Sequence, residues 1–235
     1  MKSFHATVSF GAVALTSLMM LSGSSSEGQS RPKSVEDRLR EYGAAARSRL
    51  EPAFRKAKVS YPPTRIVLVG IKAEKRLEVY AAATDGAHRL VCTYPILAAS
   101  GGPGPKLREG DRQVPEGIYP VESLNPNSRF HLSLRVGYPN AFDRAQARAE
   151  GRTNLGGDIM IHGKAVSIGC LAMGDPAAEE LFVLAADTGL KSMTVILTPV
   201  DFRKGLAVPS DTKLPAWAKS LYENIGKELA SLPAK

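Results

Sequence analysis

The sequence is poor in the residue types that build disulfide frameworks and metal sites. Its 235 residues include two cysteines, Cys92 and Cys170, and only four histidines. Two cysteines can form at most one bridge, so a fold stapled by several disulfides is excluded. The histidines lie on separate segments, which argues against a Cys and His metal site. The hydrophobic share of 43% is enough for a substantial core.

Long hydrophobic runs are also lacking, with one exception near the start of the chain. Residues 8–21 are apolar, Lys2 precedes them and small residues follow at 22–26. The apolar run is shorter than the ~20 residues that a spanning helix needs. We therefore predict a signal peptide over residues 1–26, with a retained membrane anchor as the alternative. No cysteine follows directly, so lipoprotein processing is not expected.

The charge is strongly positive. The formal net charge is +8 and the pI is about 9.5, which predicts anionic partners. Nucleic acid is not expected as a partner, because the sequence has no zinc-finger spacing, no aromatic and basic RNA-binding signature, and a predicted export signal. An anionic surface of the cell envelope agrees better with both features.

The pattern of apolar residues predicts helices at both ends of a region rich in strands. Ser34 and Asp37 form a capping box for an amphipathic helix over residues 34–50, which Pro52 should end. Short strands are predicted from residue 66 onward, including residues 66–69, 77–80, 90–97 and 193–200. A last amphipathic helix is predicted over residues 216–232.

Two further strands and a helix frame the candidate site. Strict alternation over residues 130–136 predicts Phe130 among the buried residues, with His131 on the opposite face. Residues 158–161 are nearly all apolar, which predicts a central strand that delivers His162 at its end. A later helix should begin with Asp175 as its N-cap and end at Gly189.

Cys170 and His162 are the candidate reactive pair. They lie eight positions apart, joined by a loop with two glycines, so their side chains can meet. An imidazole that takes the thiol proton leaves a thiolate and imidazolium pair of high reactivity toward acyl carbons. Gly169 lets the backbone turn so that amides near Cys170 could stabilise an oxyanion. Ser167 is expected to orient this loop or the imidazole.

Two non-catalytic interpretations of these residues remain open. A histidine at the end of a strand is often only structural, and the two cysteines could form a single disulfide. In that case the protein would be a non-catalytic module that binds the cell wall. Cys92 lies in a strand-like apolar run, where a small buried side chain is ordinary.

The segment that contains these residues resembles the L,D-transpeptidase catalytic domain family, the YkuD-like enzymes. The resemblance lies in Ile161-His162-Gly163, in the run from Ser167 to Cys170 and, upstream, in residues 106–111 and 115–119. It is closest to a YafK-like subgroup, which shares the short interval between His and Cys and the segment around Tyr138 and Asn140. Typical members carry an arginine two positions after the cysteine, where this chain has Ala172.

The resemblance implies a fold, a domain layout and a set of roles. The fold would be mainly β with peripheral helices, an α+β mixed-sheet domain over residues 59–204, flanked by a helical extension over 27–58 and by an extended segment and helix over 205–235. Cys170 would be the nucleophile and His162 the base. The Gly163 carbonyl would orient the imidazole, and the amides of Gly169 and Cys170 would form the oxyanion hole. Tyr138 and Asn140 would contact substrate or orient loops.

The resemblance also implies a reaction on peptidoglycan. Family enzymes open a peptide bond after diaminopimelate in the stem peptide, hold the acyl group as a thioester, and transfer it to an amine or to water. Transfer to an amine makes a transpeptidase, and transfer to water makes a hydrolase that could release a wall-bound lipoprotein. No metal or organic cofactor is implied, and we expect a periplasmic monomer.

Overall fold

The structure is a computed structural model of the chain that describes residues 1–3, 5, 31–208 and 213–234. Most of the predicted signal segment, residues 1–26, lies outside the described residues. Two compact units are present, Met1–Arg31 and Pro32–Lys235, and all described helices and strands belong to the second. None of the described helices has both the length and the apolar character that a membrane crossing requires.

The described part of the second unit is built around one sheet of eight strands in the order β3-β2-β1-β8-β4-β5-β6-β7. Most neighbouring strands are antiparallel, whereas β1 with β8 and β6 with β7 are parallel. The sheet is therefore mixed. The strands are β1 (Ile66–Ile71), β2 (Arg76–Ala82), β3 (His88–Pro95), β4 (Gly117–Ser128), β5 (His131–Val136), β6 (Met160–His162), β7 (Leu171–Ala172) and β8 (Met193–Thr198).

The sheet curls at its longest strand. The first residues of β4, Gly117 to Pro120, pair with β8, whereas the part from Val121 onward pairs with β5. A register shift after Val121 marks the change. A bridge between Ala98 and Ala172 then joins the chain after β3 to β7. This closure brings the segment that follows β3 next to the Cys170 loop.

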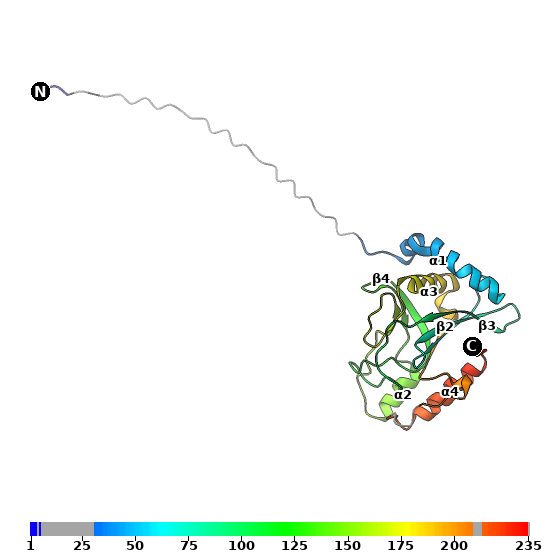
Figure 1. Cartoon of the computed structure of the whole chain (residues 1–235). Coiled ribbons are helices and arrows are strands. Elements are labelled where there is room, and N and C mark those ends of the chain that lie inside the picture. Colours follow the sequence, from blue (N-terminus) through cyan, green and yellow to red (C-terminus); the bar gives the residue numbers. More distant parts are fainter. Residues whose placement is uncertain (4, 6–30, 209–212, 235) are drawn as a thin grey trace. The chain divides into compact units, whose positions relative to one another are not determined.

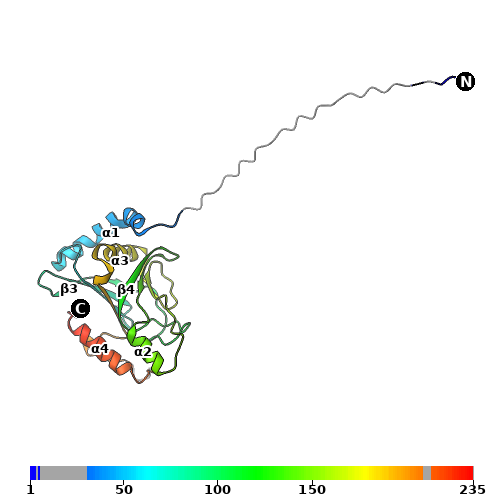
Figure 2. The same cartoon turned by 180° about the vertical axis from the view of Figure 1, so that it is seen from behind.

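Four described helices cover the sheet: α1 (Val35–Ala57), α2 (Ala141–Ala149), α3 (Asp175–Thr188) and α4 (Ala218–Ala230). In Figures 1 and 2, α1 and α3 run side by side on one face, while α4 covers the other. Alternate residues of β1 divide between these faces: Ile66 and Leu68 join the larger core, Val67 and Val69 the core under α4. The mainly β fold with peripheral helices, predicted as α+β, is confirmed.

The capping box of Ser34 with Asp37 is confirmed, but the predicted end of that helix is wrong. Pro52 lies inside α1, which continues to Ala57. An interior proline costs a helix one hydrogen bond. Contacts hold α1 on both sides of Pro52: Arg47 is paired with Asp187 of α3 before it, and Phe54 is buried in the core after it.

Three other local predictions also need correction. Phe130 is 40% exposed, because it lies in the turn between β4 and β5 and His131 has a left-handed φ of 73°, so the buried alternation begins only at Leu132. The strand before His162 is not central: β6 has three residues and is second from the end of the sheet. Helix α3 begins one residue early, with Gly174 as its N-cap. Its predicted stop at Gly189 is confirmed.

A buried ion pair joins the end of β1 to the start of β4. The Lys72 ammonium lies 2.9 Å from Glu116, whose side chain is fully buried. Glu116 also accepts hydrogen bonds from the Gly104 amide and the Tyr222 hydroxyl. One carboxylate therefore connects the sheet, the loop after β3 and α4.

Candidate active site

His162 ends β6 and is held in one orientation. The imidazole is 2% exposed, and its Nδ1 lies 2.6 Å from the Gly163 carbonyl oxygen. A carbonyl can only accept, so Nδ1 carries the proton and Nε2 is left as the acceptor. This is the arrangement that a general base needs.

Gly163 allows the hairpin tip to approach this histidine. A Cβ at this position would lie 2.5 Å from Asp175 Oδ1, and 2.9 Å from both His131 Cβ and the Phe130 carbonyl oxygen. Any larger residue would push these groups apart. The His-Gly pair in the sequence is thus explained by packing as well as by the hydrogen bond to His162.

Cys170 directly precedes β7, beside the strand that carries His162. Because His162 pairs with Ala172, Cys170 lies next to Met160, two residues before the histidine. Its Sγ is 3.4 Å from the Met160 amide nitrogen and 3.5 Å from the Asp158 carbonyl oxygen. Within the described chain, no hydrogen bond joins the thiol to the imidazole.

Burial keeps both groups neutral at rest. Desolvation raises the pKa of the Cys170 thiol, which the Met160 amide partly offsets. Desolvation also lowers the pKa of His162, against the hydrogen bond to Gly163. Both shifts disfavour the charged forms. Burial therefore favours a thiol and a neutral imidazole in the free protein.

The amides predicted to form an oxyanion hole have serine acceptors in the free protein, so they would have to exchange partners to bind an oxyanion. The Gly169 N–H donates to Ser100 Oγ at 2.6 Å, and the Cys170 N–H donates to Ser167 Oγ at 2.9 Å. Gly169 has a φ of 93°, a turn that suits glycine. An acceptor 69 residues away in the sequence could not have been anticipated.

Ser100 and Ser167 tie the Cys170 turn to its surroundings. Ser100 Oγ also donates to the Arg112 carbonyl at 2.7 Å, and Ser167 Oγ donates to the Cys170 carbonyl at 2.6 Å. Ser167 thus has the loop-orienting contacts that the sequence predicted. Ser100 was missed, because a serine in a Gly and Pro-rich loop gives no signal of its own.

Tyr138 and Asn140 lie away from the thiol. The Tyr138 hydroxyl is 3.2 Å from the carbonyl oxygens of Lys106 and Leu155, so it fastens two loops. Asn140 caps α2 by accepting from the Asp143 amide. Asn140 also donates to the Ile118 carbonyl at 3.0 Å, so both residues fasten loops by hydrogen bonds.

The thiol opens into a cavity of about 200 Å³, which we call the Cys170 cavity. Its charged lining consists of Lys106, Glu109, Arg112 and Asp158. Asp158 is paired with Arg135, and Lys106 with Asp111 at 2.6 Å. No group of His, Cys, Asp or Glu residues in the described part of the chain could hold a metal ion.

The predicted disulfide alternative is wrong for this structure, because both cysteines are free thiols. Cys92 lies on β3, at the opposite end of the strand order from β7. Desolvation raises the pKa of Cys92 to about 11. Cys92 therefore has no part in the Cys170 cavity.

Phe130, which the sequence placed in the core, instead covers the imidazole. The two rings are 4.8 Å apart between centroids. We expect Phe130→Ala to raise the pKa of His162 toward its ordinary value, because water would reach the ring and stabilise the imidazolium. NMR titration of the His162 ring measures this shift. Phe130→Leu keeps an apolar cover and should titrate like the unchanged protein, and an unaltered titration in Phe130→Ala would contradict the covering role.

Comparison with known proteins identifies the class of protein that this fold and site define. The family model YkuD, the L,D-transpeptidase catalytic domain, matches residues 64–199, more than half of the chain. The chain therefore belongs to the L,D-transpeptidase catalytic domain family of enzymes. This confirms the family resemblance, and the matched region contains both Cys170 and His162.

Particular relatives are similar over parts of the chain. YafK of Escherichia coli strain K12 and of strain O157:H7 is 42% identical over 113 residues, 47% of this chain and 43% of YafK, so the chain spans less than half of the curated relatives it matches. Among solved structures, the helical cell shape determining protein Pgp2 of Campylobacter jejuni is 23% identical with a TM-score of 0.47, covering 65% of this chain and 54% of Pgp2. L,D-transpeptidase 1 of Mycobacterium tuberculosis is 16% identical with a TM-score of 0.33, covering 57% and 62%.

Proposed function

We propose that this protein transfers acyl groups at diaminopimelate-containing stem peptides of peptidoglycan, through a thioester on Cys170. The observation that carries the proposal is the fixed tautomer of His162, whose Nε2 is free to accept a proton on the strand next to Cys170. The family match supports the same reaction.

The reaction starts from the neutral pair. The Cys170 thiol turns from the Asp158 carbonyl to His162 Nε2, which takes its proton as the sulfur attacks the peptide carbonyl carbon. The tetrahedral intermediate collapses to a thioester, and the leaving amine takes the proton from the imidazolium. An amine or water then attacks the thioester, again losing a proton to His162, and restores the thiol.

Export to the periplasm through residues 1–26 belongs to the same proposal. The substrate lies outside the cytoplasm, and the positive net charge of +8 suits an anionic wall. For a lipoprotein joined to peptidoglycan, the proposed acceptor is water.

Product analysis by mass tests the proposal and identifies the acceptor. Purified protein is incubated with a muropeptide bearing a tetrapeptide, with and without a free amine acceptor, and separately with a muropeptide joined to a lipoprotein fragment. A cross-linked product indicates a transpeptidase, and a released lipoprotein fragment indicates a hydrolase. Absence of any product, and of a thioester adduct on Cys170, would leave only a wall-binding module.

A further inference from the structure

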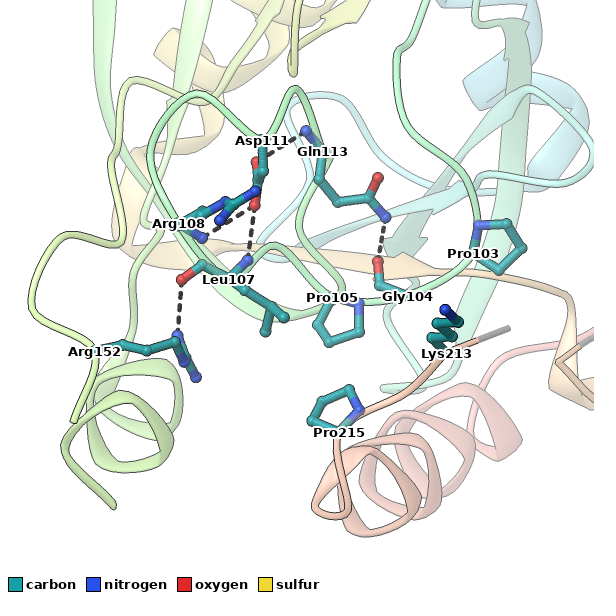
Figure 3. Close-up of a pocket in the computed structure, with 10 residues that line it drawn as sticks. All are labelled: Pro103, Gly104, Pro105, Leu107, Arg108, Asp111, Gln113, Arg152, Lys213 and Pro215. Atoms are coloured by element: carbon teal, nitrogen blue, oxygen red, sulfur yellow. Dashed lines mark hydrogen bonds between the residues drawn. The ribbon is translucent and has the colours of Figure 1, made fainter. Parts of the chain in front are cut away.

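The loop between β3 and β4 separates the Cys170 cavity from a second cavity. Lys106, Glu109 and Arg112 line the Cys170 cavity, whereas Arg108 and Asp111 line the second one, of about 420 Å³. We call it the Arg108 pocket. Figure 3 shows it between this loop, the segment after α2 and the segment before α4.

Three cations line the Arg108 pocket, and two of them have no carboxylate partner among the residues that the structure describes. Arg152 is paired with Glu150 at 2.6 Å and donates to the Leu107 carbonyl, so it forms a fixed wall. Arg108 and Lys213 are exposed, and among the described residues no carboxylate lies within ion-pair distance of either side chain.

The one carboxylate in the lining does not offset these charges. Asp111 is paired with the Lys106 ammonium and accepts the amides of Leu107, Arg108 and Gln113. Both carboxylate oxygens of Asp111 therefore accept hydrogen bonds from its own loop and not from a group in the pocket. The pocket keeps a positive potential, which attracts anions.

Three prolines make part of the remaining wall rigid and apolar. Figure 3 shows Pro103 and Pro105 from the loop facing Pro215 from the segment before α4. Proline rings give a fixed surface against which a short aliphatic side chain can pack. Two free cations beside such a surface suit a single carboxylate on an aliphatic residue better than a polyanion, which needs a continuous track of positive charge.

We infer that the Arg108 pocket binds a free carboxylate of the stem peptide while the scissile bond lies in the Cys170 cavity. Peptide stems carry such carboxylates beside aliphatic residues, and one loop lines both cavities. The pocket volume is within the range of ~300–1,000 Å³ that is common for ligand sites. The inference rests on the proposed function and deepens it, since it assigns a grip on the substrate carboxylate to Arg108 and Lys213.

The test removes both cations together. The double variant Arg108→Gln with Lys213→Gln is made in the Cys170→Ala protein, which can bind but not react, and titrated with a fluorescent diaminopimelate tetrapeptide. Binding should weaken about tenfold, the order expected for losing charge-assisted hydrogen bonds. In the protein that retains Cys170, KM should rise by the same factor while kcat stays unchanged.

Two controls isolate the carboxylate. Arg65→Gln with Lys191→Gln removes the same charge from exposed positions that do not line the pocket and should not change binding. A tetrapeptide whose carboxylates are amidated should bind the double variant and its parent equally. The inference is overturned if the control pair loses as much binding as the double variant, or if the double variant binds the amidated peptide as much more weakly as it binds the unmodified one. It is also overturned if the parent protein binds inorganic polyphosphate more tightly than the peptide.

The binding arm separates this inference from the proposed function. If the peptide binds and the double variant weakens its binding, but no preparation turns it over, the carboxylate site stands and acyl transfer fails. If turnover occurs and the double variant leaves both KM and binding unchanged, acyl transfer stands and the carboxylate site fails.

Discussion

Cys170→Ser should lower turnover of the stem peptide by at least ~10⁴-fold, in line with losses at other enzyme nucleophiles. The serine hydroxyl fits the same space but is far less acidic than a thiol. A neutral imidazole whose pKa is already lowered by burial cannot activate it effectively. Steady-state assays with mass detection of the product measure the loss.

The partner variant and a matched cysteine variant make this result specific. His162→Ala should cause a loss of similar size, and the double variant should add little, because the two groups act as a unit. Cys92→Ser changes the other free thiol, which lies on β3, and should retain activity. Substantial turnover by either Cys170→Ser or His162→Ala would refute the proposed roles.

Glu116→Leu should destabilise the fold by about 3–5 kcal/mol, the cost of leaving one partner of a buried ion pair alone. The Lys72 side chain is 10% exposed and Glu116 is fully buried. Burial already lowers the pKa of Lys72, and Glu116 opposes that shift. Removing the carboxylate also leaves the Gly104 amide and the Tyr222 hydroxyl without an acceptor. Urea denaturation followed by circular dichroism measures the change.

A second substitution distinguishes the ion pair from simple packing. Lys72→Met combined with Glu116→Leu replaces both charges by apolar groups and should recover much of the lost stability. Glu223→Leu, at an exposed position of α4, should change stability by less than about 1 kcal/mol. A double variant no more stable than Glu116→Leu would contradict an electrostatic origin.

The sequence predicted the elements whose signals are local. The capping box of α1, the strands at 66–69 and 77–80 and the stop of α3 at Gly189 all depend on residues a few positions apart. Two predictions failed for reasons that the pattern of apolar residues does not carry. Pro52 lies in a helix that tertiary contacts hold on both sides of it, and Phe130 leaves the core because the chain turns at His131.

Some features of the candidate site were predicted from the sequence, and others were not. The contact between His162 and the Gly163 carbonyl joins adjacent residues and agrees with the role that the family resemblance implied for Gly163. The partners of the Gly169 amide and the neutral state of the thiol arise from the curl of the sheet, which buries Cys170 and brings Ser100 beside it. No pattern along the chain encodes that proximity.

The serine hydroxyls at the Cys170 turn allow an exchange of acceptors during the reaction. A hydroxyl group can accept one hydrogen bond and donate another at the same time. If an incoming negative oxygen replaces Ser100 as the acceptor of the Gly169 N–H, Ser100 can still keep its hydrogen bond to the Arg112 carbonyl. Ser167 can do the same for the Cys170 amide while it holds the Cys170 carbonyl. In the proposed reaction, the turn would stay anchored in the free protein, and its two amides would become oxyanion donors only when a substrate displaces the serines.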